Sequence, residues 1–228
     1  MQKLSMASAL LSLFFLITGC SSVSNFVQQY EGYQAQQSFN QNVENSQFLV
    51  LEAKALLYEG EEEKAKILLD KAFNQFKDHS LLHETYGAYY KQTENTRLLA
   101  VSKKRANDLK VRSDQLNQKG RIAMVVYDSF VVAEDLFSLS LIYWAGNTDT
   151  LINMATLAYV SHNTGMGLAS IRQLNRLGHS SAEASMLSYF IYEMNGDVNK
   201  MATAKVEMSI LYKDTPQFAL VHGVYSNS

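Results

Sequence analysis

The chain has 228 residues, with 20 Lys and Arg against 22 Asp and Glu, which gives a formal net charge of −2. This balance argues against a nucleic-acid-binding protein, because such proteins carry a strongly basic surface. Hydrophobic residues make up 47% of the sequence, enough for a packed core. The single proline, Pro216, favours long helices, and the single cysteine, Cys20, excludes an intramolecular disulfide.

The start of the chain has the pattern of a secretory signal. Lys3 provides a positive charge, and Met6–Ile17 form an apolar segment that is too short to span a bilayer. The segment ends in Ile17-Thr18-Gly19-Cys20, which resembles the bacterial lipobox. This resemblance implies cleavage before Cys20, attachment of a lipid to its thiol, and, from Ser21, an outer-membrane location facing the periplasm. The alternative is an ordinary signal peptide with a chance cysteine.

A polar segment separates the signal, residues 1–19, from the rest of the chain. Residues 20–45 are rich in Gln and Asn, and their few apolar residues recur every three or four positions. Such a segment is either a flexible tether between the lipid and a folded domain or a weakly amphipathic helix. We expect the folded domain over residues 46–228, with a short C-terminal element from Pro216 that caps its last apolar face.

From residue 46 onward, helical patterns alternate with turns at a repeat interval of about 34 residues. A helix over Ser46–Tyr58 ends at Gly60, and a second helix over Glu61–Phe76 carries small and apolar residues on one face. The later turns are expected at Glu94, at Asp128, at Asn163-Thr-Gly165 and at Asn195-Gly196-Asp197. The first two steps then match the repeat interval, whereas the third step is longer and the fourth is shorter.

This pattern resembles the tetratricopeptide repeat, a helical hairpin whose length is that same interval. Small residues and one large apolar residue stand at matching spacings in the first unit: Ala53, Gly60, Ala65, Leu69 and Ala72. The resemblance implies an all-α superhelical solenoid of about five degenerate hairpins, in which small residues let the helices approach closely. An irregular helical bundle is the alternative. The apolar stretch Ala123–Tyr143 is also compatible with a strand, but the phase of the repeat favours a helix.

Motifs for catalysis or cofactor binding are absent from the sequence. There is no Gly-rich phosphate loop and no Gly-x-Ser-x-Gly motif. His79 and His83 are four residues apart, a spacing that can hold Zn²⁺, but the glutamate of the metalloprotease pattern is missing, and a helix-capping role beside Asp78 is the simpler interpretation. We therefore expect no metal, no cofactor and no enzymatic activity.

The charged and aromatic residues suggest where partners could bind. By resemblance to tetratricopeptide repeats, a concave groove would be lined by Lys54, Tyr58, Glu84, Lys91, Tyr159, His162, Phe190 and Glu193. Amphipathic aromatic residues with mixed charges suit the capture of a peptide or a helix. A basic group, Lys103, Lys104, Arg105, Lys110 and Arg112, is interpreted as a solvated helix face rather than a site for an acidic partner or a lipid head group.

Lipidated repeat proteins of this kind resemble the assembly lipoproteins of tight-adherence (Tad) pili and the pilotins of type IV pilus secretins. The segment Thr150–Tyr159 is most similar to the Tad component. The resemblance implies a non-enzymatic scaffold with protein partners, such as a secretin or pilus-assembly components, and a membrane anchor through its lipid. The alternatives are a scaffold for outer-membrane β-barrel assembly or cell-wall hydrolase regulation, and a helical envelope domain with a ligand or an enzymatic activity.

Overall fold

A computed structural model describes residues 37–223 of the chain. Every regular element in this range is a helix, which confirms the predicted all-α fold. The helices are the segment 37–58 (the first helix), α2 (Glu62–Gln75), α3 (Ser80–Gln92), α4 (Thr96–Val125), α5 (Phe130–Tyr143), α6 (Thr148–Val160), α7 (Thr164–Arg176), α8 (Ala182–Met194), α9 (Val198–Leu211) and α10 (Pro216–His222). Within residues 37–223, no helix has the length and hydrophobicity needed to cross a membrane. The predicted signal, Cys20 and residues 20–36 of the predicted tether lie outside the described residues. Residues 37–45 of that segment are helical and continue into the helix expected from Ser46, so the folded part begins before residue 46.

The helices begin at a constant interval, which equals the predicted repeat interval. The second helices of the hairpins begin at Glu62, Thr96, Phe130, Thr164 and Val198. The helices α6, α8 and α10 begin at Thr148, Ala182 and Pro216, with the same spacing. The hairpins pair the first helix with α2, α3 with α4, α4 with α5, α6 with α7, and α8 with α9, and α10 packs on the last. The predicted stack of about five helical hairpins is therefore confirmed.

Each hairpin turns through one residue in the left-handed backbone conformation. These residues are Gly60, Glu94, Asp128, His162 and Gly196, with φ between 50° and 79°. The predicted turn at Asn163-Thr-Gly165 is wrong, and so are the longer third step and the shorter fourth step, because His162 rather than Gly165 adopts this conformation. Histidine, like Asn and Asp, tolerates the left-handed region better than most residues. Asn163 instead caps the next helix, and its side chain accepts a hydrogen bond from the backbone N–H of Met166.

One helix breaks the hairpin pattern. The repeat interval places a boundary between hairpins at Ser113, yet α4 continues through it for 30 residues. At other boundaries the chain leaves the helix through residues such as Trp144-Ala-Gly-Asn147 or Leu177-Gly178. The corresponding residues 110–113, Lys-Val-Arg-Ser, include neither Gly nor Pro, although the boundary residues 76–79, Phe-Lys-Asp-His, also lack both and still leave the helix. The second helix of hairpin 2 and the first helix of hairpin 3 therefore form one continuous helix, α4.

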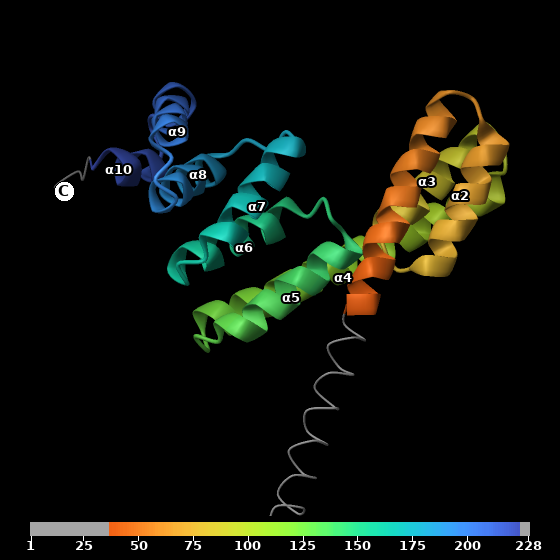
Figure 1. Cartoon of the computed structure of the whole chain (residues 1–228), viewed down its shortest axis with the longest axis horizontal. Helices are drawn as coiled ribbons and strands as arrows, with labels where there is room; N and C mark the ends of the chain where they lie inside the picture. Colours follow the sequence, from red (N-terminus) through yellow and green to blue (C-terminus); the bar gives the residue numbers. More distant parts are fainter. Residues whose placement is uncertain (1–36, 224–228) are drawn as a thin grey trace, which may run out of the picture.

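The continuous helix divides the stack into two groups of helices. Figure 1 shows the first helix, α2 and α3 gathered at one end of α4, with α5 along its other end. The first helix also reaches the second group, because its residues 40–47 line a groove of about 380 Å³ together with residues of α5, α6 and α7. Val43, in this segment, is 5% exposed. The first helix therefore bridges the two groups.

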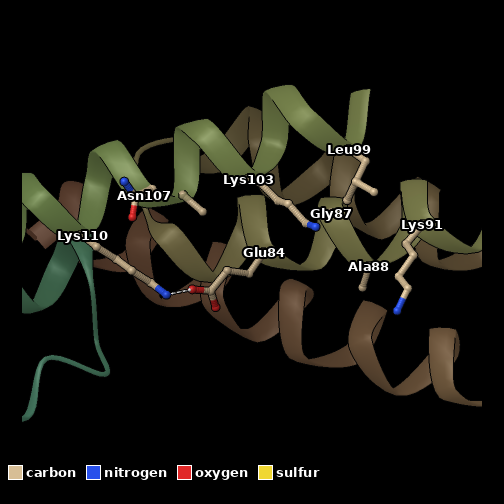
Figure 2. A pocket seen from close by; sticks show the side chains of 9 residues that line it. Glu84, Gly87, Ala88, Lys91, Leu99, Lys103, Asn107 and Lys110 are labelled. Carbon is tan, nitrogen blue, oxygen red and sulfur yellow. Dashed lines mark ion pairs between the residues drawn. The ribbon is translucent and has the colours of Figure 1, made fainter. Parts of the chain in front are cut away.

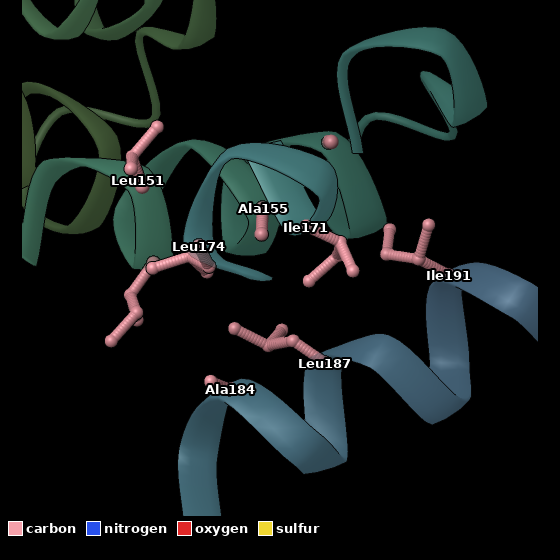
Figure 3. Close-up of a cluster of buried hydrophobic side chains, with 9 residues drawn as sticks. Leu151, Ala155, Ile171, Leu174, Ala184, Leu187 and Ile191 are labelled. Carbon is pink, nitrogen blue, oxygen red and sulfur yellow. The ribbon is translucent and has the colours of Figure 1, made fainter. Parts of the chain in front are cut away.

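Apolar clusters hold each group together. The largest one joins α6, α7 and α8 through Leu151, Ile171, Leu174, Leu187 and Ile191 (Figure 3). Close approach between helices depends on glycine at two points. A Cβ added to Gly167 would lie 2.5 Å from Ile191 Cδ1, and one added to Gly120 would lie 2.5 Å from Phe137 Cε1. Gly120 thus provides the small residue that the third hairpin needs.

A buried polar network fixes the middle of α4. Ser113 Oγ lies 2.9 Å from the carbonyl oxygen of Ser140 and 2.8 Å from its hydroxyl, and Ser140 Oγ donates to the carbonyl of Ser113 at 2.9 Å. Asn147 Nδ2 donates to Ser113 Oγ and to Asp114 Oδ1, both at 2.9 Å. Ser140 Oγ is also 2.9 Å from Thr150 Oγ1. The network ties α4, α5 and the start of α6 together at the point where the other hairpins have a loop.

Candidate functional site

The continuous α4 leaves one hairpin face uncovered. In the other hairpins, the helix that follows packs on the pair: α3 contacts α2, α6 contacts α4 and α5, α8 contacts α6 and α7, and α10 contacts α8 and α9. The helix that should cover α3 and the first half of α4 is residues 114–125. These residues extend the axis of α4 instead of folding back over α3 (Figure 1).

An open groove of about 410 Å³ occupies this uncovered face (Figure 2). Its floor consists of small or apolar residues from both helices, Gly87 and Ala88 on α3 and Leu99 and Ala106 on α4. Its polar lining comprises Glu84, Lys91, Lys103, Asn107 and Lys110. The groove therefore combines an apolar floor with a mainly basic rim.

The repeat interval shows how this face differs from the covered ones. Glu84 stands at the position of Val50 in hairpin 1 and Ile152 in hairpin 4. Lys103 likewise stands at the position of Leu69 and Ile171. The four aliphatic side chains are between 0% and 8% exposed beneath their covering helices, whereas Glu84 and Lys103 are exposed. Compared with hairpins 1 and 4, the uncovered face of hairpin 2 thus has charged residues where burial would be costly. Hairpin 5, which is covered only by the short α10, also has an exposed lysine, Lys205, at the position of Lys103.

The charges of the groove are only partly compensated. Lys110 Nζ lies 2.6 Å from Glu84 Oε1, and also 5.3 Å from the ring centroid of Trp144 in the α5–α6 connection. Lys91 and Lys103 make no ion pair with any described residue. The helix α4 carries eight basic and two acidic residues, a net charge of +6 in a chain whose total is −2. The groove is therefore a basic region on an otherwise acidic protein.

The basic group identified in the sequence divides between different environments. Arg105 pairs with Asp78, and Arg112 lies over the ring of Tyr143, 4.4 Å from its centroid. Lys103 lines the groove, whereas its neighbour Lys104 is exposed and does not. The interpretation as a solvated face therefore holds for the exposed Lys103 and Lys104, whereas Lys110, Arg105 and Arg112 are engaged by Glu84, Asp78 and Tyr143.

Of the eight residues predicted for the concave groove, Glu84 and Lys91 line the uncovered face. Tyr159 and Phe190 contact each other, with ring centroids 5.2 Å apart. Glu193, near the end of α8, is exposed. The pKa of Tyr189 is raised, first by desolvation of the Tyr189 hydroxyl and then by the nearby charge of Glu193. The other three are Lys54 and Tyr58, both exposed on the first helix, and His162, which forms a hairpin turn.

The sequence analysis does not predict the remaining groove residues as site residues: Gly87, Ala88, Leu99, Lys103, Ala106, Asn107 and Lys110. The sequence does contain a signal for Lys103, since a lysine replaces Leu69, the buried aliphatic residue at the same position of the preceding repeat. That substitution identifies an open groove only once the structure shows that the covering helix is absent.

The two neighbouring histidines are structural. His79 is 2% exposed, and its Nε2 lies 2.9 Å from Ser46 Oγ, which is also 2.9 Å from the carbonyl oxygen of Ala72. Burial, with a contribution from His83, lowers the pKa of His79 to about 4. The expected capping role is wrong, because the His79 side chain makes no hydrogen bond to the start of α3. No group of three or more His, Cys, Asp or Glu among residues 37–223 is arranged to hold a metal.

Together these features define the described part of the chain as an all-α stack of repeated helical hairpins with one uncovered face. No protein-family model matches the sequence, and no curated protein is significantly similar to it. Among solved structures, PilF from Pseudomonas aeruginosa has 14% identity and a TM-score of 0.40, covering 80% of this chain and 98% of that one. PilW, a widely conserved type IV pilus biogenesis factor, has 11% identity and a TM-score of 0.40, covering 78% and 98%. At these values the likeness assigns neither a family nor a function.

Proposed function

We propose that this protein is a non-enzymatic scaffold that binds a partner protein during assembly of an envelope machine. The observation that carries the proposal is the uncovered face of hairpin 2, where an apolar floor with a basic rim stands open at the place where other hairpins bind a helix. Exposed apolar floors with polar rims are typical of protein interaction sites. The lining includes no His, Cys or Ser, and its one carboxylate, Glu84, is paired with Lys110.

The proposal includes the location that the sequence suggests. Cys20 would carry the lipid, residues before the first helix would form the tether, and the helical stack would face the periplasm from the outer membrane. Support for this comes from the lipobox resemblance of Ile17–Cys20 alone. The specific machine we propose is a Tad or type IV-like pilus or its secretin, on the resemblance of Thr150–Tyr159.

Site-specific photo-crosslinking in the source cells tests the scaffold. A photoreactive phenylalanine analogue is placed at Asn107 in the groove and, as a matched control, at Lys104 outside it, and crosslinked proteins are identified by mass spectrometry. We expect Asn107, but not Lys104, to yield a secretin or pilus-assembly protein. Crosslinks from Asn107 to barrel-assembly or cell-wall proteins would assign the scaffold to those systems. The absence of any crosslinked protein specific to Asn107 would contradict the proposal.

The anchor is tested separately with Cys20→Ala. We expect this variant to lose palmitate labelling and to leave the outer-membrane fraction, and the groove crosslink to weaken as a result. Unchanged fractionation and labelling would contradict lipid anchoring at Cys20.

A further inference from the structure

We propose that the uncovered face of hairpin 2 binds an amphipathic helix of a partner protein, and that this helix carries acidic residues on both sides of a narrow apolar face. The inference rests on the proposed scaffold function and specifies the chemistry of the partner. Its evidence is the geometry and charge of the groove, compared with the covered hairpins of the same chain.

The shape of the groove points to a helix. On hairpin 4, the 13-residue helix α8 fills the equivalent face, with Ala184, Leu187 and Ile191 against α6 and α7 (Figure 3). The face of hairpin 2 is built from the same positions of the same repeat unit. It therefore has room for one helix of three to four turns, bound as α8 is bound.

The floor specifies where the partner's large and small side chains lie. In hairpin 4 the floor has Gly167, against Ile191, and Leu174. In hairpin 2 the corresponding residues are Leu99 and Ala106, so the large and small positions are exchanged. We infer that the partner helix presents a small residue to Leu99 and a larger apolar residue to Ala106. The floor therefore disfavours a helix whose large and small apolar residues follow the same order as those of α8.

The rim specifies the partner's charge. Lys91 lies on α3 and Lys103 on α4, and Figure 2 shows Lys103 extending from α4 toward α3. A wholly apolar helix would cover both ammonium groups without compensation, which is unfavourable. Acidic residues flanking the apolar face of the partner helix would pair with both lysines. The net charge of +6 on α4 would also speed association of an acidic helix with the groove at low salt. The groove therefore favours an acidic helix over a neutral or basic one.

A lipid head group is a weaker fit to this arrangement. Head-group sites bring several cations to one point, whereas Lys91 and Lys103 stand on different helices and the third lysine, Lys110, is already paired with Glu84. The apolar floor runs along two packed helices, as the floors covered by α3, α6, α8 and α10 do. Binding of lipid in place of the helix would therefore overturn the proposal.

Binding of defined peptides to the full chain, purified in detergent, tests the proposal. Two synthetic 16-residue helical peptides share one Ala/Leu face, and one is flanked by Glu and the other by Lys. Binding is measured by fluorescence anisotropy at 50 and 300 mM salt. We expect the Glu peptide to bind, its affinity to fall with salt, and Lys91→Glu or Lys103→Glu to weaken it at least tenfold. The matched control Lys104→Glu, one residue away and outside the groove, should change affinity less than twofold.

Several results would overturn the inference. These are equal binding of the two peptides, no binding of the Glu peptide, or binding that Lys103→Glu leaves unchanged while circular dichroism shows the variant folded. Binding to phosphatidylethanolamine/phosphatidylglycerol vesicles that Lys103→Glu abolishes, without peptide binding, would indicate a lipid. Self-association in sedimentation that the same variant abolishes would indicate a second copy. If Asn107 crosslinks a partner in cells but the Glu peptide does not bind, the scaffold function stands and this inference fails.

Discussion

His162 lies one repeat after Asp128, and the two residues share a left-handed backbone, with φ of 55° and 50°. Gly196 follows one repeat later with φ of 70°. The hairpin turns therefore recur without any insertion or deletion, although three of the five turn residues are not glycine. The interval is maintained by the backbone conformation of the turn rather than by residue identity.

This conformation predicts opposite effects for two substitutions at one position. His162→Gly should raise the free energy of unfolding by about 0.5–1 kcal/mol, because glycine adopts positive φ without a steric penalty. His162→Ala should lower it by about 1 kcal/mol, since alanine bears that penalty without the tolerance of histidine. Urea denaturation monitored by circular dichroism measures both. Equal effects of the two substitutions would contradict a left-handed turn at this residue.

The network at the middle of α4 makes a second prediction. Asn147→Ala removes both a helix cap on α6 and the hydrogen bonds to Ser113 and Asp114. We expect it to lower the free energy of unfolding by about 2–4 kcal/mol, because the cap is lost and the buried partners of Asn147 are left without a hydrogen bond. Asn163→Ala is the control, because Asn163 caps α7 but is exposed, and it should cost only about 1 kcal/mol. Thermal and urea denaturation measure both variants. If Asn147→Ala and Asn163→Ala lose similar amounts of unfolding free energy, the network contributes nothing beyond the cap.

Glycine packing makes a third prediction. In Gly120→Ala the new methyl would lie within 2.5–3.1 Å of three Phe137 ring atoms, and we expect a loss of about 1–3 kcal/mol in unfolding free energy. Gly87→Ala places a methyl at 3.7 Å from Leu99 Cδ1, and should stabilise α3 by up to about 1 kcal/mol through helix propensity. Adding Phe137→Leu to Gly120→Ala should recover part of the loss. Denaturation midpoints that move the same way for both glycines would contradict the close contact.

The sequence predicts the hairpin stack well because the interval is carried by local signals. Gly60, Glu94, Asp128 and Gly196 stand between apolar helical patterns, and those patterns identify each of them as a turn. His162 is missed because Gly165, three residues later, has the stronger intrinsic preference for a turn. Local preference alone does not show which of two nearby turn signals the packing of the flanking helices selects.

The uncovered groove is beyond sequence reasoning for a different reason. Nothing in the sequence shows that the helix covering hairpin 2 is missing, and Lys103 on α4 is interpreted from its basic neighbours as an ordinary solvated lysine. Its role appears only when residues 110–113 are seen to remain helical, which leaves the neighbouring face of α3 open. Glu84 and Lys91 are predicted for a different surface, the concave groove of a solenoid, and the structure places them on the uncovered face of hairpin 2 instead.

The buried histidine predicts an acid-sensitive fold. The pKa of His79 is about 4 in the native protein because of burial and the nearby His83, against 6.5 for an ordinary histidine. Below pH 6.5 the unfolded chain binds a proton that native His79 does not bind until about pH 4, so acid favours unfolding. The stability that neutral His79 provides is complete above pH 6.5 and is lost as the pH falls toward 4. A pKa lowered this far corresponds to a loss of up to about 3 kcal/mol.

The geometry of His79 explains why protonation is unfavourable there. Nε2 faces the hydroxyl of Ser46 at 2.9 Å, whereas the buried Nδ1 has no hydrogen-bond partner among the described residues. A second ring proton would therefore be placed at Nδ1 without an acceptor. In His79→Asn we expect a shallower loss of unfolding free energy between pH 6.5 and 4, measured by urea denaturation at each pH. His162→Gln, at an exposed turn, is the control and should keep the wild-type slope. Because carboxylates and His83 titrate in all three proteins, identical slopes for wild type and His79→Asn would refute a role for His79.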